Sequence, residues 1–286
     1  MTKEVIHLPE IAKISVQKKD KHRYNIFLKE NGQDVYAFSV AEDLLIEHHL
    51  RKGLTISDEL IEQLKEKDSF YKVYTLSLRY LSYRMRSEKE IIDYLHQKEV
   101  DIETIKAVVQ RLKQEKWLDD LAFAESFVRT RLQMAVKGPL LIRKELADKG
   151  VSNESIEQAL IQYPFEDQME KIDKWLNKQN QMSSKKSYKQ QLENLKQRLM
   201  QKGFTQDAIQ EALQQHSFEK DPNEEYQAVV YQGEKLIQKY KRKAAGSQLR
   251  QKVTAALYRK GFSFDVIEPF LDEYLDESAN EHDINW

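Results

Sequence analysis

The phrase Leu146-Ala-Asp-Lys149-Gly150-Val151 decides the fold, because closely similar phrases stand at three other places in the chain. The other copies are Leu95-His-Gln-Lys98-Glu-Val100, Leu199-Met-Gln-Lys202-Gly203-Phe204 and Leu257-Tyr-Arg-Lys260-Gly261-Phe262. Their leucines are 51, 53 and 58 residues apart, a spacing typical of one supersecondary unit repeated along a chain. Repeats of this kind present extended surfaces to a partner rather than a catalytic pocket.

Each copy predicts the end of one helix and the start of the next. The glycine predicts a left-handed cap at the end of a middle helix, and the following Val or Phe supplies the apolar contact of such a cap. The first copy has Glu99 instead of glycine, so we expect a strained or differently shaped corner there. A polar residue then begins a third helix: Asp101, Ser152, Thr205 or Ser263. Apolar residues follow at helical spacing: Ile105/Val108/Val109, Ile156/Ala159/Leu160, Ile209/Ala212/Leu213 and Ile267/Phe270/Leu271.

We therefore predict a mainly α protein of tandem three-helix repeats with a small N-terminal antiparallel β-sheet region. The expected domains are 1–69 (sheet plus helices), 70–119, 120–164, 165–218 and 219–275 (repeats one to four), and an acidic tail, 276–286. The predicted helices are 70–83, 87–97 and 101–116; 120–135, 138–149 and 152–162; 165–180, 187–202 and 205–216; and 222–243, 247–260 and 263–275. Ser87 and Glu90 form a predicted capping box at the start of the second of these helices.

The first 56 residues follow a different pattern. Apolar residues alternate over 11–40 around Asn31-Gly32, a strong hairpin signal because both turn residues need a positive φ. We expect a three-stranded antiparallel sheet there. A helix over 41–49 and another beginning at Ser57 should follow.

Composition narrows the class of protein. Gly and Pro are few, at 8 and 5 residues, and 33% of the residues are charged, which favours helices. The absence of cysteine fits a reducing cytoplasm, and no apolar stretch approaches the length of a membrane span. The seven histidines follow no metal-ligand spacing, and no phosphate-binding glycine loop is present. We expect a cytoplasmic monomer without catalytic residues, bound metal or cofactor.

Charge is unevenly distributed along the chain. Residues 174–264 contain 18 Lys/Arg against 8 Asp/Glu, a net of +10, whereas 265–286 contain 8 Asp/Glu and no Lys/Arg. A basic block beside an acidic tail suggests contact with a polyanion, with the tail folding back over the block. The alternative is a solvated helical surface.

The middle of the chain resembles the RecX family, whose members regulate the RecA recombinase. The resemblance covers about 80 residues and keeps several motifs in order. The residues that carry it are Arg86-Ser87, Glu90, Leu95, Trp117-Leu118-Asp119-Asp120, Phe123-Ala124, Phe127-Val128, Arg131, Lys137-Gly138-Pro139, Ile142, Glu145-Leu146, Lys149-Gly150-Val151, Ile156 and Ala159-Leu160. The β region and the third and fourth repeats resemble long members from Gram-positive bacteria.

The resemblance implies a curved array of three-helix units that binds in the groove of the RecA–DNA filament. Such a protein would tune filament assembly, ATPase activity, strand exchange and the stimulated self-cleavage of a repressor, in DNA repair and the SOS response. Its partners would be RecA and RecA–single-stranded-DNA filaments, with weak electrostatic contact to DNA. Shorter members have three units, so the fourth leaves open which units would enter the groove.

The Trp117-Leu118-Asp119-Asp120 motif joins the first two repeats. Its apolar pair is suited to a buried wedge between repeats, and either aspartate to capping the next helix. A carboxylate pair for metal or acid–base chemistry is the alternative, but adjacent helical residues do not face each other. We assign these four residues, with Gly138 and Gly150, a structural role, and Trp117 as a partner-binding anchor remains the second interpretation.

Basic residues recur at the corner before each middle helix, where stacked repeats would align them in a stripe that follows a polyanion. The candidates are Arg84, Arg86, Arg129, Arg131, Lys137, Arg143, Lys144, Lys185, Lys186, Lys189, Lys241, Arg242, Lys243 and Arg250. The helix start after Lys137 also offers backbone N–H groups suited to an anion. For Tyr188, Tyr240 and Tyr258, helical spacing favours the core over stacking on bases.

Two other functions fit the sequence. Three-helix units with a tight turn are also the geometry of helix-turn-helix modules, so a DNA-binding module or transcription regulator acting without RecA is one alternative. A scaffold for another protein, with charges serving only solvation, is the other.

Overall fold

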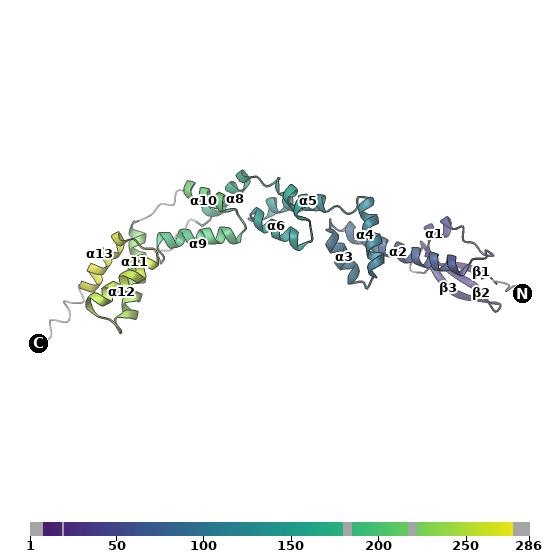
Figure 1. Cartoon of the computed structure of the whole chain (residues 1–286), viewed down its shortest axis with the longest axis horizontal. Helices are drawn as coiled ribbons and strands as arrows, with labels where there is room; N and C mark the ends of the chain where they lie inside the picture. The colour runs from purple at the N-terminus through teal and green to yellow at the C-terminus, as the bar shows by residue number, and fades with distance from the viewer. Residues whose placement is uncertain (1–7, 19, 180–184, 217–221, 277–286) are drawn as a thin grey trace, which may run out of the picture. The chain divides into compact units, whose positions relative to one another are not determined.

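The computed structural model describes residues 8–18, 20–179, 185–216 and 222–276 (Figure 1). The chain divides into two compact units, one comprising 1–124 and 148–155, the other 125–147 and 156–286. The acidic tail beyond Asp276 lies outside the described residues, and with it the expected contact with the basic block.

The N-terminal sheet is confirmed. Strands β1 (Ile11–Val16), β2 (Arg23–Glu30) and β3 (Gln33–Ala41) pair antiparallel in the order β1-β2-β3. Asn31 and Gly32 turn the β2–β3 hairpin with φ values of 52° and 83°, as a turn with two positive φ angles requires. One face of the sheet packs its apolar side chains against α1 (Glu42–Glu47) and α2 (Asp58–Ser82).

Helix α2 begins earlier than the helix start predicted at Phe70. The prediction of a separate helix over 70–83 is wrong, because a single helix runs from Asp58 to Ser82 and begins on the Ser57 cap. Asp68, 2% exposed, lies in its middle and accepts hydrogen bonds from Arg23 (2.6 Å) and the Ala41 backbone (3.0 Å). This buried carboxylate connects α2 to the sheet, and its partners offset the cost of burying its charge.

Three-helix repeats follow, as predicted. The first uses the end of α2 with α3 (Glu88–His96) and α4 (Ile102–Gln114), and the second has α5 (Asp120–Met134), α6 (Pro139–Asp148) and α7 (Asn153–Leu160). The third has α8 (Phe165–Asn177), α9 (Tyr188–Gln201) and α10 (Gln206–Gln215). The fourth has α11 (Pro222–Tyr240), α12 (Gly246–Arg259) and α13 (Phe264–Leu271), which continues into a π-helical turn, Asp272–Asp276.

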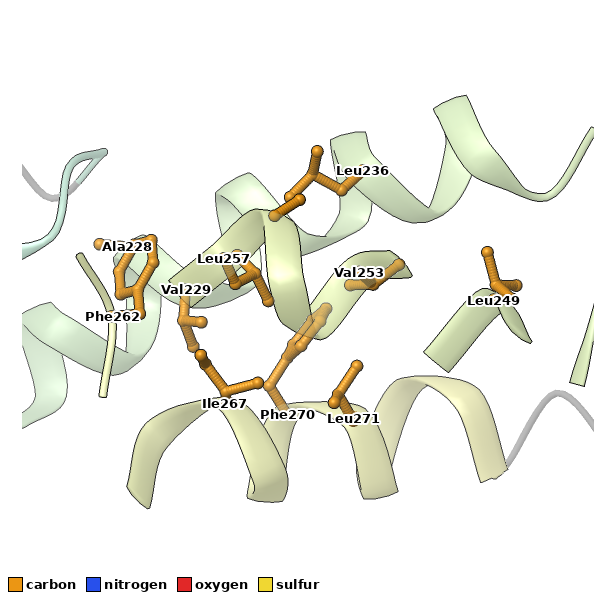
Figure 2. Packing of buried hydrophobic residues seen from close by; sticks show 11 residues of the cluster. Ala228, Val229, Leu236, Leu249, Val253, Leu257, Phe262, Ile267, Phe270 and Leu271 are labelled. Atoms are coloured by element: carbon orange, nitrogen blue, oxygen red, sulfur yellow. The ribbon is translucent and has the colours of Figure 1, made fainter. Parts of the chain in front are cut away.

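The recurring leucine and isoleucine form the cores of the repeats. Leu95, Leu146, Leu199 and Leu257 are fully buried, and so are Ile156, Ile209 and Ile267, with Ile105 at 1% exposure. In the fourth repeat, Val229 of α11, Leu257 of α12 and Ile267 of α13 belong to one apolar cluster (Figure 2). Burying such side chains stabilises each repeat by about 1.5–3 kcal/mol per residue.

Side-chain caps begin most of the helices where the sequence predicted them. The capping box of Ser87 and Glu90 is complete, and Asp101 and Thr205 accept backbone hydrogen bonds at the starts of α4 and α10. Ser263 departs from the pattern, because its side chain makes no cap hydrogen bond at the start of α13.

Each middle helix ends in the left-handed turn that the repeated phrase predicts. Gly150, Gly203 and Gly261 have φ values of 80°, 83° and 88°. Glu99 has a φ of 59°, so the first repeat keeps the same corner with a strained residue. We call the three glycine corners, Lys149-Gly150, Lys202-Gly203 and Lys260-Gly261, the Lys-Gly turns.

Candidate functional site

Each Lys-Gly turn covers the start of the middle helix of the preceding repeat. At the first of these joints, the Ser87 hydroxyl donates to the Lys149 carbonyl (2.7 Å) and the Lys89 ammonium to the Asp148 carbonyl (2.9 Å). The Glu88 backbone N–H donates to the Asp120 carboxylate (2.8 Å). The unpaired N–H groups that every helix start leaves behind are thus partly satisfied by the next repeat.

At the second joint, the next repeat occupies the helix start that was predicted to bind an anion. The Gly138 N–H donates to the Lys202 carbonyl (2.7 Å) and the Leu140 N–H to the Gly203 carbonyl (2.9 Å), while Pro139 between them has no N–H. The expectation that this helix start is free to bind a phosphate is therefore wrong, because protein carbonyls occupy the Gly138 and Leu140 donors.

The third joint repeats the chemistry of the first. The Ser187 hydroxyl donates to the Lys260 carbonyl (2.5 Å), and the Tyr188 N–H donates to the Glu225 carboxylate (2.8 Å). Joints one and three therefore each combine a serine at the start of the middle helix with a carboxylate from the next repeat. In joint two, Gly138-Pro139 stands where the other joints have the serine.

At the three Lys-Gly turns the start of a neighbouring helix comes so close that only glycine fits. The first corner, at Glu99, has no such neighbour in the described part of the chain and therefore tolerates a side chain. A Cβ atom on Gly150 would lie 2.7 Å from the Lys89 Cβ, and one on Gly261 would lie 2.9 Å from the Ser187 Oγ. Real side chains do not approach so closely, so these positions need glycine for space as well as for φ. Glu99 is exposed, and no repeat precedes it to be approached.

Arg84 binds an acidic residue of the first joint instead of facing a partner. Its guanidinium grips Glu90 with two hydrogen bonds (2.8 and 3.2 Å), and Lys149 reaches the same carboxylate from the next repeat (2.9 Å). Burial alone would raise the pKa of Glu90, but the hydrogen bonds from Arg84, Lys149 and the Ser87 backbone outweigh it and lower the pKa to about 2.

Arg86 is held by aromatic rings. Its guanidinium carbon lies 4.0 Å from the ring centre of Tyr80, which stacks on Tyr94 at 3.9 Å. The Arg86 Nε atom is buried without a hydrogen-bond partner among the described residues. Cation–π contact orients this arginine without neutralising its charge.

Most candidates in the second repeat are paired with acidic residues. Arg131 (2.8 Å) and Lys137 both bind Glu145, and together they lower its pKa although burial opposes this. Arg143 grips Glu157 with two hydrogen bonds, one of 2.9 Å. Arg129 contacts Gln162 (3.2 Å) and Glu125 (3.9 Å). The exposed pair of Arg143 and Glu157 contributes little to stability.

The remaining candidates separate into two groups. Arg250 pairs with Asp272 (2.5 Å), and Lys185 lies 5.5 Å from the ring centre of Tyr231. Six exposed cations form no ion pair or side-chain hydrogen bond within the described ranges: Lys144, Lys186, Lys189, Lys241, Arg242 and Lys243. We call these six the free cations.

Charge also separates by helix within the repeats. The middle helix α9 carries three Lys/Arg and one Glu, and α12 carries Arg250, Lys252 and Arg259 with no acidic residue. The third helices α7, α10 and α13 each carry two acidic residues and no Lys/Arg. The middle helices of the third and fourth repeats therefore form the positive surfaces.

The Trp117 motif differs from its prediction in one residue. Trp117 is 59% exposed, so the expectation of a buried wedge is wrong for it, whereas Leu118 is buried in the core of the first repeat. Asp119 accepts the Ala122 N–H (2.9 Å) and caps α5. Asp120 turns away to cap α3 across the joint, and burial raises its pKa.

Two other features were not predicted. Tyr258, favoured for the core, is 57% exposed, and Phe264 beside it is 51% exposed. Contacts across a joint, such as Asp120 to Glu88, leave no periodic signal in a sequence.

Within the described ranges, no group of three or more His, Asp or Glu could hold a metal ion, and no helix is long and apolar enough to cross a membrane.

Comparison with known proteins places these features in a family. Family models match in chain order: the N-terminal domain of regulatory protein RecX (9–57), and the first (74–112), second (119–160) and third (223–271) three-helix domains of RecX. The third matched domain is the fourth repeat, so α8–α10 lie between the second and third matched domains.

Relatives match over nearly the whole chain. "Regulatory protein RecX" of Oceanobacillus iheyensis is 49% identical over 94% of this chain and 100% of its own. The protein of the same name from Halalkalibacterium halodurans is 44% identical over 92% of this chain and 99% of its own. A crystal structure of regulatory protein RecX matches with a TM-score of 0.61 and 33% identity, covering 73% of this chain and 100% of that one. The chain belongs to the RecX family of regulatory proteins.

Proposed function

We propose that this protein regulates the RecA recombinase by binding the RecA–single-stranded-DNA filament, and so modulates filament assembly, ATPase activity, strand exchange and coprotease activity. Support comes from the family and from one structural observation, the free cations. They sit at or beside the middle helices of the second to fourth repeats, where none of the residues that the structure describes pairs with them.

Free cations are suited to a phosphate backbone. Each phosphate that a protein neutralises releases condensed counterions, so binding through several of them weakens steeply with salt. The paired arginines and lysines of the first two repeats hold the joints and helices instead. In this proposal the third and fourth repeats provide most of the electrostatic attraction, and the first two provide shape.

The helix-turn-helix alternative has less support. A recognition helix in the major groove approaches phosphates and usually carries arginine, lysine, asparagine or glutamine. In the second to fourth repeats, α7, α10 and α13 hold the recognition-helix position and carry acidic residues and no Lys/Arg, although α7 and α10 carry Asn or Gln. In the first repeat α4 holds this position and does carry basic residues, Lys106, Arg111 and Lys113. The Lys-Gly turns that precede α7, α10 and α13 are also covered by the neighbouring repeat.

The deciding experiment compares binding to RecA–single-stranded-DNA filaments with binding to naked DNA, at low and moderate salt, with RecA ATPase measured in parallel. We expect preference for the filament, a steep salt dependence and altered ATPase activity. Equal binding to naked DNA without an effect on ATPase would contradict the proposal. Sequence-preferring duplex binding without RecA would favour the helix-turn-helix alternative.

We also propose that the protein acts as a monomer in the cytoplasm, without catalysis. Light scattering after size-exclusion chromatography tests the monomer, since a mass near twice 33.9 kDa would contradict it. A scaffold role would show as normal filament binding after all six free cations are replaced by glutamine.

A further inference from the structure

A groove lies on the exposed side of α12 in the fourth repeat. Its volume is about 530 Å³. It is lined by Ser247, Arg250, Gln251, Thr254, Ala255, Tyr258 and Phe264. Ser247, Gln251, Thr254 and Tyr258 recur at helical spacing, so they form one face of the helix.

Two exposed aromatic rings line one end of this groove. The rings of Tyr258 and Phe264 stack at 5.1 Å with an interplanar angle of 25°. More than half of each residue is exposed, which is unfavourable for large apolar surfaces in water. The pair offers a flat, apolar surface whose orientation is set by the end of one helix and the start of the next.

Neither ring is required by the repeat. The residue after the repeated leucine is His96, Ala147 and Met200 in the first three repeats, and Tyr258 in the fourth. The residue after the polar starter is Ile102, Asn153 and Gln206, and then Phe264. Only the fourth repeat has an aromatic residue at both positions, so the pair is not part of the general architecture.

Polar groups line the rest of the groove. The Gln251 amide is exposed and forms no side-chain hydrogen bond with the described residues, so it can both donate and accept. The Thr254 hydroxyl donates to the Arg250 carbonyl (2.8 Å) and keeps its oxygen available as an acceptor. An amide and a hydroxyl beside an aromatic surface match the edges and the face of a nucleobase.

Charge complementarity identifies the occupant. Helix α12 has no acidic residue, and exposed Lys252 and Arg259 stand next in sequence to Gln251 and Tyr258. Three free cations, Lys241, Arg242 and Lys243, precede the helix. The carboxylate of Asp272 is engaged by Arg250, two helical turns from Tyr258, although Asp265 and Glu268 of α13 keep negative charge near Phe264.

We propose that this groove binds single-stranded DNA, with a base stacked on Tyr258 and Phe264, the phosphates beside that base held by Lys252 and Arg259, and phosphates further along the strand held by the cations before α12. The proposal rests on the proposed function and names the surface that contacts the nucleic acid. Duplex DNA is excluded as the preferred ligand, because its bases already stack on one another and hide their faces. Stacking tolerates any base, so no sequence preference is expected.

The test measures fluorescence anisotropy of a labelled oligo-dT with the full chain and with Y258A/F264A. Loss of base stacking should weaken binding about 5- to 100-fold, with the salt slope unchanged because the phosphate contacts remain. The matched control is Y83A, since Tyr83 is 73% exposed and lies outside the groove. It should bind like the unmodified chain.

An abasic oligonucleotide of the same length isolates the stacking contribution. The unmodified chain should lose affinity for it by a similar factor, whereas Y258A/F264A should bind both oligonucleotides equally. Y258W keeps an aromatic ring and should retain binding, which separates loss of stacking from loss of folding. Equal affinity of the unmodified chain for oligo-dT and the abasic strand would overturn the proposal.

Filament binding, measured in parallel, separates this proposal from the proposed function. If Y258A/F264A binds oligo-dT normally but loses filament binding, the groove contacts protein and the single-strand proposal is overturned while the regulator role stands. If the unmodified chain ignores filaments, the regulator role fails, and the oligo-dT comparison still decides the groove.

Discussion

At the scale of single residues, Glu90 has the most connections in the first joint. It completes the capping box with Ser87, binds Arg84 of its own repeat and accepts from Lys149 of the next. Its side chain is 18% exposed, so these partners must offset the loss of water around a charge. In the sequence, Glu90 is recognisable only as a cap, because the capping box is a local pattern and Lys149 is 59 residues away.

The pKa of Glu90 predicts acid sensitivity at this joint. The folded-state pKa, about 2, lies below the ordinary value of 4.5, so the ionised carboxylate stabilises the fold above pH 4.5. That contribution is lost as pH falls from 4.5 towards 2. E90Q should lower the free energy of unfolding by about 1–3 kcal/mol at pH 7 and flatten its pH dependence below 4.5.

Urea denaturation at pH 7, 4.5 and 3 checks this prediction. E103Q is the matched control, because Glu103 is 78% exposed and, among the described residues, forms an ion pair only with Lys106 nearby in α4. It should change stability by less than about 0.5 kcal/mol. A pH profile of E90Q parallel to that of the unmodified chain would contradict a special role for Glu90.

At the scale of elements, the Lys-Gly turn combines two demands on one residue. The left-handed φ alone disfavours a side chain, and the approach of the neighbouring helix start leaves no room for one. Glu99 meets the first demand at a cost and is free of the second. The two demands can therefore be measured separately in this chain.

Substitution of Gly150 should show both effects. G150A places a Cβ atom 2.7 Å from the Lys89 Cβ in addition to the strained φ of 80°, and should destabilise by about 2–4 kcal/mol. The matched control is G53A, since Gly53 has a φ of 83° and its nearest neighbouring atom is 4.0 Å away. It should cost about 1–2 kcal/mol. Equal losses in thermal denaturation would show that the joint is looser than the structure indicates.

Glu99 offers the reverse change. E99G should stabilise the chain by up to about 1 kcal/mol, because it relieves a positive φ of 59° at an exposed corner. The gain should appear as a higher urea midpoint with an unchanged slope. A loss of stability would mean that the Glu99 side chain makes contacts that stabilise this corner.

At the scale of the whole molecule, the distribution of cations separates structural from available charge. The basic residues of the first two repeats largely bind acidic partners, while Lys186, Lys189 and the three cations before α12 form no ion pair with the described residues. Net charge, at −1 overall, hides this arrangement. A surface that acts on a polyanion is therefore better located by the partners of each cation than by their number.

Charge reversal tests this division. K241E/R242E/K243E should weaken binding to RecA–single-stranded-DNA filaments and lower the slope of log affinity against log salt by about 2–3, since each lost phosphate contact contributes about 0.7–0.9. The matched control, K52E/K65E/K106E, makes the same change in charge at exposed lysines of the first unit. Equal effects of the two variants would point to net charge rather than to a site.

Sequence by itself determined the local architecture of this protein. The Asn31-Gly32 hairpin, the buried leucine and isoleucine of each repeat, and the left-handed corners follow from periodicity and from φ preferences, which act between neighbouring residues. Tertiary structure decided the rest. The continuity of α2, the occupation of the α6 start by Lys202 and Gly203, and the exposure of Trp117 and Tyr258 depend on residues distant in sequence. An arginine bound to a carboxylate and a lysine facing water have the same pattern in a sequence, and only packing shows which charges the fold uses and which it leaves for a partner.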